Sequence, residues 1–124
     1  MAQGKILIVE DETVCALSLQ RILKSLGYET VQITTTGEEA IVLARSEKPD
    51  VVLMDINLGA GMDGIQAAEK ILLEFGIPVI FMTGYYDEEI IEKATHVNPS
   101  AILRKPLDIK MLLSAVKSAI EKTS

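Results

Sequence analysis

The sequence predicts an α/β fold built on a doubly wound, five-stranded parallel sheet with five helices. Two observations lead to this prediction. Short, uninterrupted apolar runs recur along the chain, and segments in which apolar residues have helical spacing separate them. Uninterrupted runs are typical of strands that are covered on both faces, as the strands of parallel sheets are. Strict alternation of strand and helix then places helices on both faces of the sheet.

The predicted strands occupy residues 6–9, 28–34, 51–55, 78–82 and 101–104. The central strand is the apolar run that ends at Asp55. In the second segment Val31 and Ile33 alternate with polar residues, which is typical of a less covered edge strand. Right-handed crossovers between parallel strands leave few topologies for this order of elements.

Helices are predicted over about residues 13–26, 36–44, 64–75, 87–96 and 108–122. Their ends carry recognisable start and stop signals. Asp87 and Asp108 are suited to cap helix N-termini, and Gly27 stands where a helix C-terminus is expected. Thr36 and Glu39 have the spacing of a capping box.

The composition indicates one domain over residues 1–124 with an aliphatic core, since 48% of the residues are hydrophobic but only 4% are aromatic. The net charge is −6, whereas a nucleic-acid-binding surface needs a basic footprint. No apolar run approaches the roughly 18 to 20 residues of a membrane span, and the N-terminus lacks a signal-peptide pattern. We therefore expect a cytoplasmic domain that binds neither nucleic acid nor membrane directly.

Cys15 is the single cysteine of the chain. A lone cysteine excludes an internal disulfide and argues against any cysteine-based metal site. We expect it to be a small buried hydrophobic residue, as free cysteines usually are.

The polar residues at the carboxyl ends of the predicted strands are the candidate functional residues. With the strand order 2-1-3-4-5 these ends lie side by side, and ligands of open α/β sheets bind at that edge. The residues concerned are Glu10, Asp11, Asp55, Thr83 and Lys105.

The chemistry of this set points to phosphoryl transfer. Three carboxylates in one pocket repel one another, so a cation is expected among them. An all-oxygen site with room for water suits Mg²⁺ or Mn²⁺ rather than zinc. A hydroxyl and an ammonium group at the same edge would suit a tetrahedral anion placed on Asp55. A carboxylate nucleophile, a metal and donors for phosphoryl oxygens are the components of such a site.

Five short segments, taken in order, resemble the receiver domain of two-component response regulators, which has a flavodoxin-like fold. Each segment alone is a weak signal, but their order and spacing together are specific, and the resemblance covers the whole chain. The segments are residues 7–12 (Leu-Ile-Val-Glu-Asp-Glu), 53–55 (Leu-Met-Asp), 62–64 (Met-Asp-Gly), 82–84 (Met-Thr-Gly) and 105–106 (Lys-Pro).

The resemblance implies that Asp55 accepts a phosphoryl group from the phosphohistidine of a sensor histidine kinase or a phosphotransfer protein. Asp11 and Asp55 would bind Mg²⁺ through their carboxylates. Asn57 would bind it through its backbone carbonyl, and Glu10 would act through metal-bound water.

The resemblance also assigns roles on the other side of the pocket. The hydroxyl of Thr83 would meet the phosphoryl group, and Lys105 would pair with it. A conformational switch would involve Thr83 and Ile102 and would control a downstream protein or a covalently linked output domain. In this family the bond that corresponds to Lys105-Pro106 is often cis, which proline makes tolerable.

Two departures from the family pattern affect the expected function. Ile102 occupies the position where the family usually has Tyr or Phe, whose rotamer change reports phosphorylation. Gly59-Ala60-Gly61 stands where a proline is usual, in a loop one residue longer than is common. Extra glycines increase backbone freedom close to the expected metal.

Two alternative functions remain to be weighed. A phosphatase of the haloacid-dehalogenase type also forms an aspartyl phosphate, but Asn57 stands where it needs a proton-transferring Asp, so we expect a signalling phosphoacceptor and not an enzyme. A pseudo-receiver that acts without phosphate is the alternative, because of Ile102 and the altered loop. The sequence leaves open a homodimer, a longer parent protein, and whether Tyr85 and Tyr86 contact a partner or pack within their loop.

Overall fold

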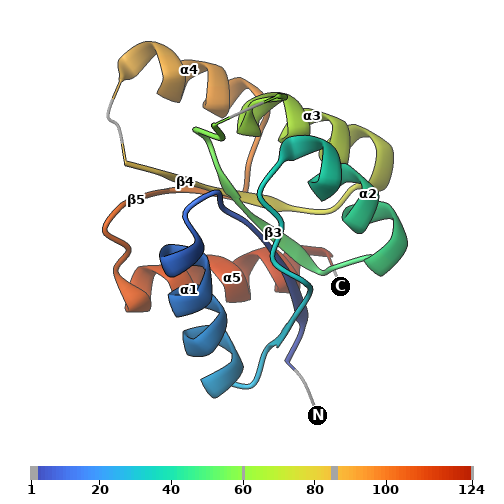
Figure 1. Ribbon diagram of the computed structural model, residues 1–124, viewed down its shortest axis with the longest axis vertical. Coiled ribbons are helices and arrows are strands. Elements are labelled where there is room, and N and C mark those ends of the chain that lie inside the picture. The colour runs from blue at the N-terminus through green and yellow to red at the C-terminus, as the bar shows by residue number, and fades with distance from the viewer. Residues whose placement is uncertain (1–2, 60, 85–86, 124) are drawn as a thin grey trace.

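Five parallel strands form one sheet in the order β2-β1-β3-β4-β5 (Figure 1). This result confirms the predicted fold class and strand order. The computed structural model describes residues 3–59, 61–84 and 87–123, so the expectations for Ala60, Tyr85 and Tyr86 lie outside the described residues. The strands are β1 (Lys5–Val9), β2 (Glu29–Thr30), β3 (Val51–Asp55), β4 (Val79–Thr83) and β5 (Ala101–Arg104).

Helices cover both faces of the sheet. In Figure 1, α1 and α5 lie on one side of the strands, and α2, α3 and α4 lie on the other. The helices are α1 (Thr13–Ser25), α2 (Gly37–Glu47), α3 (Gly64–Phe75), α4 (Glu88–His96) and α5 (Ile109–Thr123).

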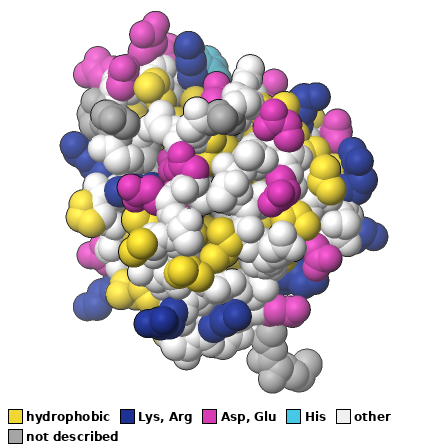
Figure 2. All heavy atoms as spheres, viewed as in Figure 1, with side chains coloured by type: hydrophobic (Ala, Val, Ile, Leu, Met, Phe, Trp, Pro, Cys, Tyr) yellow, Lys and Arg dark blue, Asp and Glu magenta, His cyan; other side chains and the backbone are white. Residues whose placement is uncertain are grey.

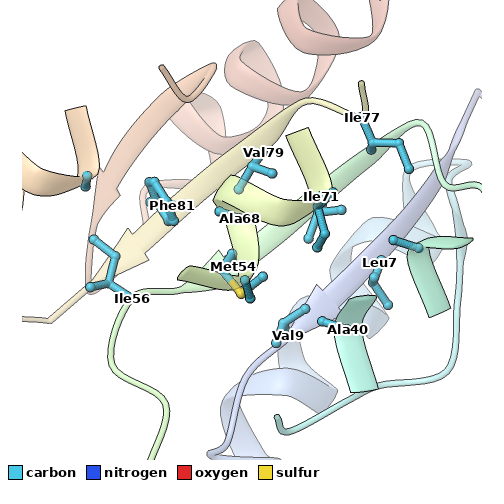
Figure 3. Packing of buried hydrophobic residues seen from close by; sticks show 14 of the residues in the cluster. Leu7, Val9, Ala40, Met54, Ile56, Ala68, Ile71, Ile77, Val79 and Phe81 are labelled. Atoms are coloured by element: carbon cyan, nitrogen blue, oxygen red, sulfur yellow. The ribbon is translucent and has the colours of Figure 1, made fainter. Parts of the chain in front are cut away.

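Each face of the sheet has its own apolar core. Because side chains alternate across a strand, Leu7 and Val9 join one core while Ile6 and Ile8 join the other. Figure 3 shows the core on the α2, α3 and α4 side, where strand residues such as Met54 pack against α3. Burial of β1, β3 and β4 on both faces explains why their sequences are uninterrupted apolar runs.

The predicted edge strand at residues 28–34 is mostly wrong. Only Glu29–Thr30 pairs with β1 as a strand, and Thr34 forms an isolated bridge with Val9. The register explains the interruption. Ile6 pairs with Thr30 and Val9 with Thr34, so four residue steps on the edge segment face three on β1. One extra residue cannot continue the ladder, although the alternating apolar pattern persists.

The helix ends follow the predicted signals. At the end of α1 the amides of Gly27 and Tyr28 donate to the carbonyls of Lys24 and Leu23, which is a Schellman motif with Gly27 at φ +95°. Thr36 caps α2 by accepting from the amide of Glu39. Further side-chain caps are made by Asp63, Asp87 and Asp108.

Three further expectations concern the Lys105-Pro106 bond, the surface charges and membrane spans. The bond between Lys105 and Pro106 is cis. On the face shown in Figure 2, Lys and Arg side chains are scattered among Asp and Glu, without a continuous basic area. Within the described ranges, no helix combines the length and the apolar character that crossing a bilayer requires.

Candidate functional site

The strand order brings the predicted polar residues to one edge of the sheet. Asp55 and Thr83 are the last residues of β3 and β4, and Lys105 directly follows β5. Neighbouring backbones are joined at this edge, since the amide of Ile56 donates to Met82 O at 3.0 Å and the amide of Lys105 to Thr83 O at 2.8 Å. The paired strands therefore fix the backbones that carry these side chains.

Lys105 links two acidic residues from different strands. Its Nζ lies 2.8 Å from Glu10 Oε1 and 3.2 Å from Asp55 Oδ2. Glu10 is fully buried and Asp55 is 4% exposed, whereas a quarter of the Lys105 side chain is exposed. The other oxygen of Asp55, Oδ1, accepts from the backbone amide of Asn57 at 3.0 Å. The carboxylate of Asp55 is thus held in place through both oxygens.

Burial and charge change the proton affinities of this pair. Burial, followed by the neighbouring carboxyl group of Asp55, raises the pKa of Glu10 from 4.5 to about 7, although Lys105 opposes the shift. Burial alone would lower the pKa of Lys105, but its hydrogen bond to Glu10 and the two carboxylate charges outweigh that effect and raise it. Lys105 is therefore a cation at neutral pH, whereas Glu10 gains or loses its proton near neutral pH.

The acidic side of the pocket has the composition of a site for a hard cation. Glu10, Asp11 and Asp55 each offer a carboxylate oxygen, and these oxygens lie within 4.8 Å of one another. Glu10 Oε2 is buried and has no hydrogen-bond partner among the described residues. Asp11 is exposed, and its Oδ2 accepts from the amide of Gly59 at 3.1 Å. This all-oxygen set fits Mg²⁺ or Mn²⁺.

Thr83 and Ile102 lie on the far side of Asp55 from Glu10, along β4 and β5. Thr83 is 1% exposed and stands opposite Arg104 in the ladder. Ile102 pairs with Phe81 and is half-buried. It packs against the core on the α2, α3 and α4 side, where Ile90 of α4 also packs. Ile102 and Ile90 thus pack against the same apolar core, and Ile102 lies on the strand that pairs with β4, which ends at Thr83.

Cys15 is not the buried hydrophobic residue that we expected. It is half-buried, and its Sγ donates a hydrogen bond to Glu12 Oε2 at 3.0 Å. That hydrogen bond, and to a smaller extent burial, raises the pKa of the thiol. One ligand atom each from Glu10, Glu12 and Cys15 also lies within 4.8 Å of the others. Cys15 stands near the N-terminus of α1, where the helix turns part of its side chain toward solvent.

Sequence reasoning missed the contacts that hold the β3–α3 loop, by which we mean its described residues 56–59 and 61–63. Glu38 of α2 accepts from the amide of Met62 with both carboxylate oxygens, at 3.3 Å each. Glu38 lies in the first turn of a helix, where acidic residues are ordinary, so its sequence position alone gave no sign of this contact.

The comparisons with known proteins agree on one family. The family model of the response regulator receiver domain matches residues 6–117. The chain is 34% identical over 118 residues to the transcriptional regulatory protein PdtaR of Mycobacterium tuberculosis, covering 95% of this chain and 57% of PdtaR. It is 33% identical over 118 residues to sporulation initiation phosphotransferase F of Bacillus subtilis, covering 94% of each.

Solved structures give the same result. The signal receiver domain of a modulated diguanylate cyclase from Desulfovibrio desulfuricans superposes with a TM-score of 0.91 at 36% identity, covering 96% of this chain and 94% of that one. A receiver domain protein from Methanospirillum hungatei superposes with a TM-score of 0.87 at 31% identity, covering 95% and 94%. The chain spans 57% of PdtaR and 43% of the regulator PhyR of Methylorubrum extorquens. Receiver domains are signalling modules, and this chain belongs to the response regulator receiver domain family of two-component signalling.

Proposed function

We propose that Asp55 accepts a phosphoryl group in a Mg²⁺-dependent reaction, and that the donor is the phosphohistidine of a sensor histidine kinase or a phosphotransfer protein. The observation that carries the proposal is the Lys105 ammonium group, which contacts both Glu10 and Asp55 at the mouth of the acidic pocket. A cation fixed beside a carboxylate nucleophile can neutralise the charge that an incoming phosphoryl group brings.

The described residues fit a resident Mg²⁺. Asp11 and Asp55 supply carboxylate oxygens close together, and the buried Glu10 Oε2 has no described partner. The backbone amide of Asn57 donates to Asp55 Oδ1, and the backbone carbonyl of Asn57 would be a further oxygen ligand. A bound Mg²⁺ would supply positive charge that offsets the repulsion between these carboxylates and the phosphoryl oxygens.

The transfer itself needs few parts from the protein. A carboxylate oxygen of Asp55 attacks phosphorus while the P–N bond to the donor imidazole breaks, and the electron pair of that bond stays on the leaving nitrogen. The amide of Asn57 holds the nucleophile in position. Lys105, which contacts Asp55, and the hydroxyl of Thr83 would then supply hydrogen bonds to the oxygens of the new acyl phosphate.

The acyl phosphate would draw Thr83 toward it and so change the packing beside Ile102. Both residues lie at the β4–β5 end of the site, next to α4. A phosphoryl group shifts the two conformations only by its different interaction energy in each. The readout would be a downstream protein or a linked output domain, and the regulators PdtaR and PhyR extend well beyond the matched part.

Intact-protein mass spectrometry tests the proposal. After incubation with acetyl phosphate and Mg²⁺, the wild-type chain should carry one phosphate, and Asp55→Asn should carry none. Removal of Mg²⁺ with EDTA should prevent the modification. Absence of an adduct on the wild type, or an equal adduct on Asp55→Asn, would contradict the proposal.

A second function, an interaction module that needs no phosphate, is favoured by one observation. Ile102 gives the β4–β5 end of the site a smaller side chain than the aromatic residue typical of the family, and this side chain is half-buried. Beryllofluoride, a mimic of the phosphoryl group, distinguishes the two functions. Chemical shifts in α4 and β5 should move on its addition if a phosphate-driven switch exists and stay constant in a pseudo-receiver.

A further inference from the structure

The β3–α3 loop is firmly closed at its two ends. The amide of Gly64 donates to Ile56 O at 3.2 Å, and Gly64 lies so close to the carbonyl of Asp55 that a Cβ there would collide with it. Between these points the loop contains Gly59 and Gly61, so its own backbone provides little stiffness. The loop nevertheless carries Asn57, whose carbonyl is a candidate metal ligand.

Two carboxylates from outside the loop hold its middle. Asp11 Oδ2 accepts from the amide of Gly59 at 3.1 Å, and both oxygens of Glu38 accept from the amide of Met62 at 3.3 Å. The two acceptors come from different parts of the fold, because Asp11 follows β1 and Glu38 belongs to α2. The glycine-rich segment is therefore tied down at two points.

The contact with α2 depends on two glycines that allow a close approach. Gly61 has φ +73°, and a Cβ on it would lie 2.6 Å and 2.9 Å from the carboxylate oxygens of Glu38. A Cβ on Gly37, the first residue of α2, would lie 2.9 Å from Met62 O. A Cβ on Gly37 would push against the loop backbone, whereas a Cβ on Gly61 would displace the Glu38 carboxylate from its place beside the loop. The first turn of α2 thus packs closely against Gly61 and Met62.

The two ties differ in what metal binding would do to them. Asp11 belongs to the acidic group with Glu10 and Asp55, so its carboxylate would be shared between the metal and the amide of Gly59. Glu38 belongs to neither of the groups of possible metal ligands found among the described residues. The hydrogen bonds that Glu38 accepts from Met62 can therefore remain when the carboxylate of Asp11 binds a metal ion.

We propose that Glu38 is a positioning residue for the metal side of this site: by holding Met62, it keeps the glycine-rich β3–α3 loop, and with it the Asn57 carbonyl, in place for the divalent cation. The inference rests on the proposed function, because it assigns a role in binding the Mg²⁺ that phosphorylation would need. It also accounts for a longer, glycine-rich loop beside a metal site, since an outside carboxylate replaces the stiffness that the loop lacks.

A helix-dipole role for Glu38 is the simpler reading and gives the matched control. Glu38 and Glu39 both lie in the first turn of α2, where a negative charge is favourable. Among the described residues, no side-chain hydrogen bond or ion pair joins Glu39 to the loop, and its backbone amide donates to Thr36 Oγ1. Glu39→Ala therefore removes the same charge from the same turn and leaves the Met62 contact intact.

The first measurement needs no metal. Amide hydrogen exchange of the metal-free, ¹⁵N-labelled chain should show faster exchange at Met62 in Glu38→Ala than in wild type or Glu39→Ala. Glu38→Gln should restore most of the protection, because its amide oxygen still accepts a hydrogen bond. In Gly61→Ala the new methyl group should displace the Glu38 carboxylate and expose the Met62 amide in the same way. Unchanged exchange at Met62 in Glu38→Ala would overturn the inference.

The second measurement is calorimetric titration of MgCl₂ into each metal-free protein. Loss of a partly exposed hydrogen bond predicts that Glu38→Ala binds Mg²⁺ roughly three- to tenfold more weakly than Glu39→Ala. Glu38→Gln should recover affinity toward that of the control, and Gly61→Ala should match Glu38→Ala. If Glu38→Ala and Glu39→Ala bind equally, the positioning role is wrong and the proposed function stands. A wild-type chain that binds no Mg²⁺ would instead contradict the proposed function itself.

Discussion

The buried strand ends and the β3–α3 loop hold their parts of the site by different means. Asp55 and Thr83 end strands that are paired on both sides, and they are 4% and 1% exposed. The loop is held by hydrogen bonds that its backbone amides donate to two exposed carboxylates, those of Asp11 and Glu38. The nucleophile is therefore placed by the core of the fold, whereas the loop beside it is placed by a few surface contacts.

Substitutions in these two parts of the site should therefore have different effects on stability and on metal affinity. Disturbing the packed backbone near Asp55 should cost stability as well as function, because a close-packed interior cannot absorb added volume. Disturbing the surface ties should change metal affinity and leave the fold intact, because exposed hydrogen bonds and ion pairs contribute little to stability.

The largest effect is expected from Gly64→Ala, where the loop meets the strand. The added Cβ would meet the backbone carbonyl of Asp55 and the Cα of Ile56, neither of which can move cheaply. We expect the free energy of unfolding to fall by about 3 kcal/mol. Urea denaturation measures it. Gly84→Ala is the control, since no atom of the described residues apart from its chain neighbours lies within 4 Å of its added Cβ, and the change should stay within about 0.5 kcal/mol. Equal stabilities of the two variants would show that the loop end is not packed as described.

The next effect is a pH dependence that comes from Glu10. Because burial raises its pKa from 4.5 to about 7, the folded metal-free chain binds a proton more tightly than the unfolded chain does. The stabilisation from this proton is complete below about pH 4.5, is lost as the pH rises to about 7, and is on the order of 3 kcal/mol. Unfolding free energies measured across this range should fall less steeply with pH in Glu10→Gln. Identical slopes in wild type and Glu10→Gln would contradict the burial of an ionisable Glu10.

A smaller effect should follow from Lys105→Met. The hydrogen bond and charge of Lys105 lower the pKa of Glu10, so their loss should raise that pKa above about 7. The expected change is roughly tenfold tighter proton binding. An NMR titration of the Glu10 carboxyl carbon measures it, with Lys110→Met on exposed α5 as the control for charge. A pKa that falls in Lys105→Met would rule out the contact seen between these residues.

The smallest effect is expected at Cys15. Its side chain is half-buried and bonds only to the exposed Glu12 among the contacts described, so Cys15→Ala should change stability by about 0.5 kcal/mol or less. Leu23→Ala, on the buried side of the same helix, should cost about 3 kcal/mol. Thermal unfolding compares the two. A loss at Cys15 as large as that at Leu23 would show that the thiol is part of the core.

These contrasts also explain what the sequence could predict. The strands β1, β3 and β4 were predictable because burial on both faces leaves uninterrupted apolar runs, and the polar residues that end them fall at one edge by topology. The sequence therefore predicts that Glu10, Asp55 and Lys105 lie together. Their side-chain contacts agree with that placement.

The remaining features depend on geometry that local sequence patterns do not encode. The alternating apolar pattern of residues 28–34 predicts a full strand, but the register with β1 allows strand pairing only over Glu29–Thr30 and at Thr34. Glu38 bonds to Met62, 24 residues away, and resembles any acid in a first helical turn. Cys15 was judged by its residue type, whereas its position on α1 sets its exposure.

The role of Asp55 as the phosphoacceptor is tested most directly by locating the phosphoryl group chemically. Borohydride reduces an aspartyl phosphate to homoserine, and tandem mass spectrometry identifies the residue that changed. After phosphorylation with acetyl phosphate and Mg²⁺, homoserine should be found at position 55 and should be absent when EDTA is present. Homoserine at Asp11 or Asp63, or at no position, would contradict the account.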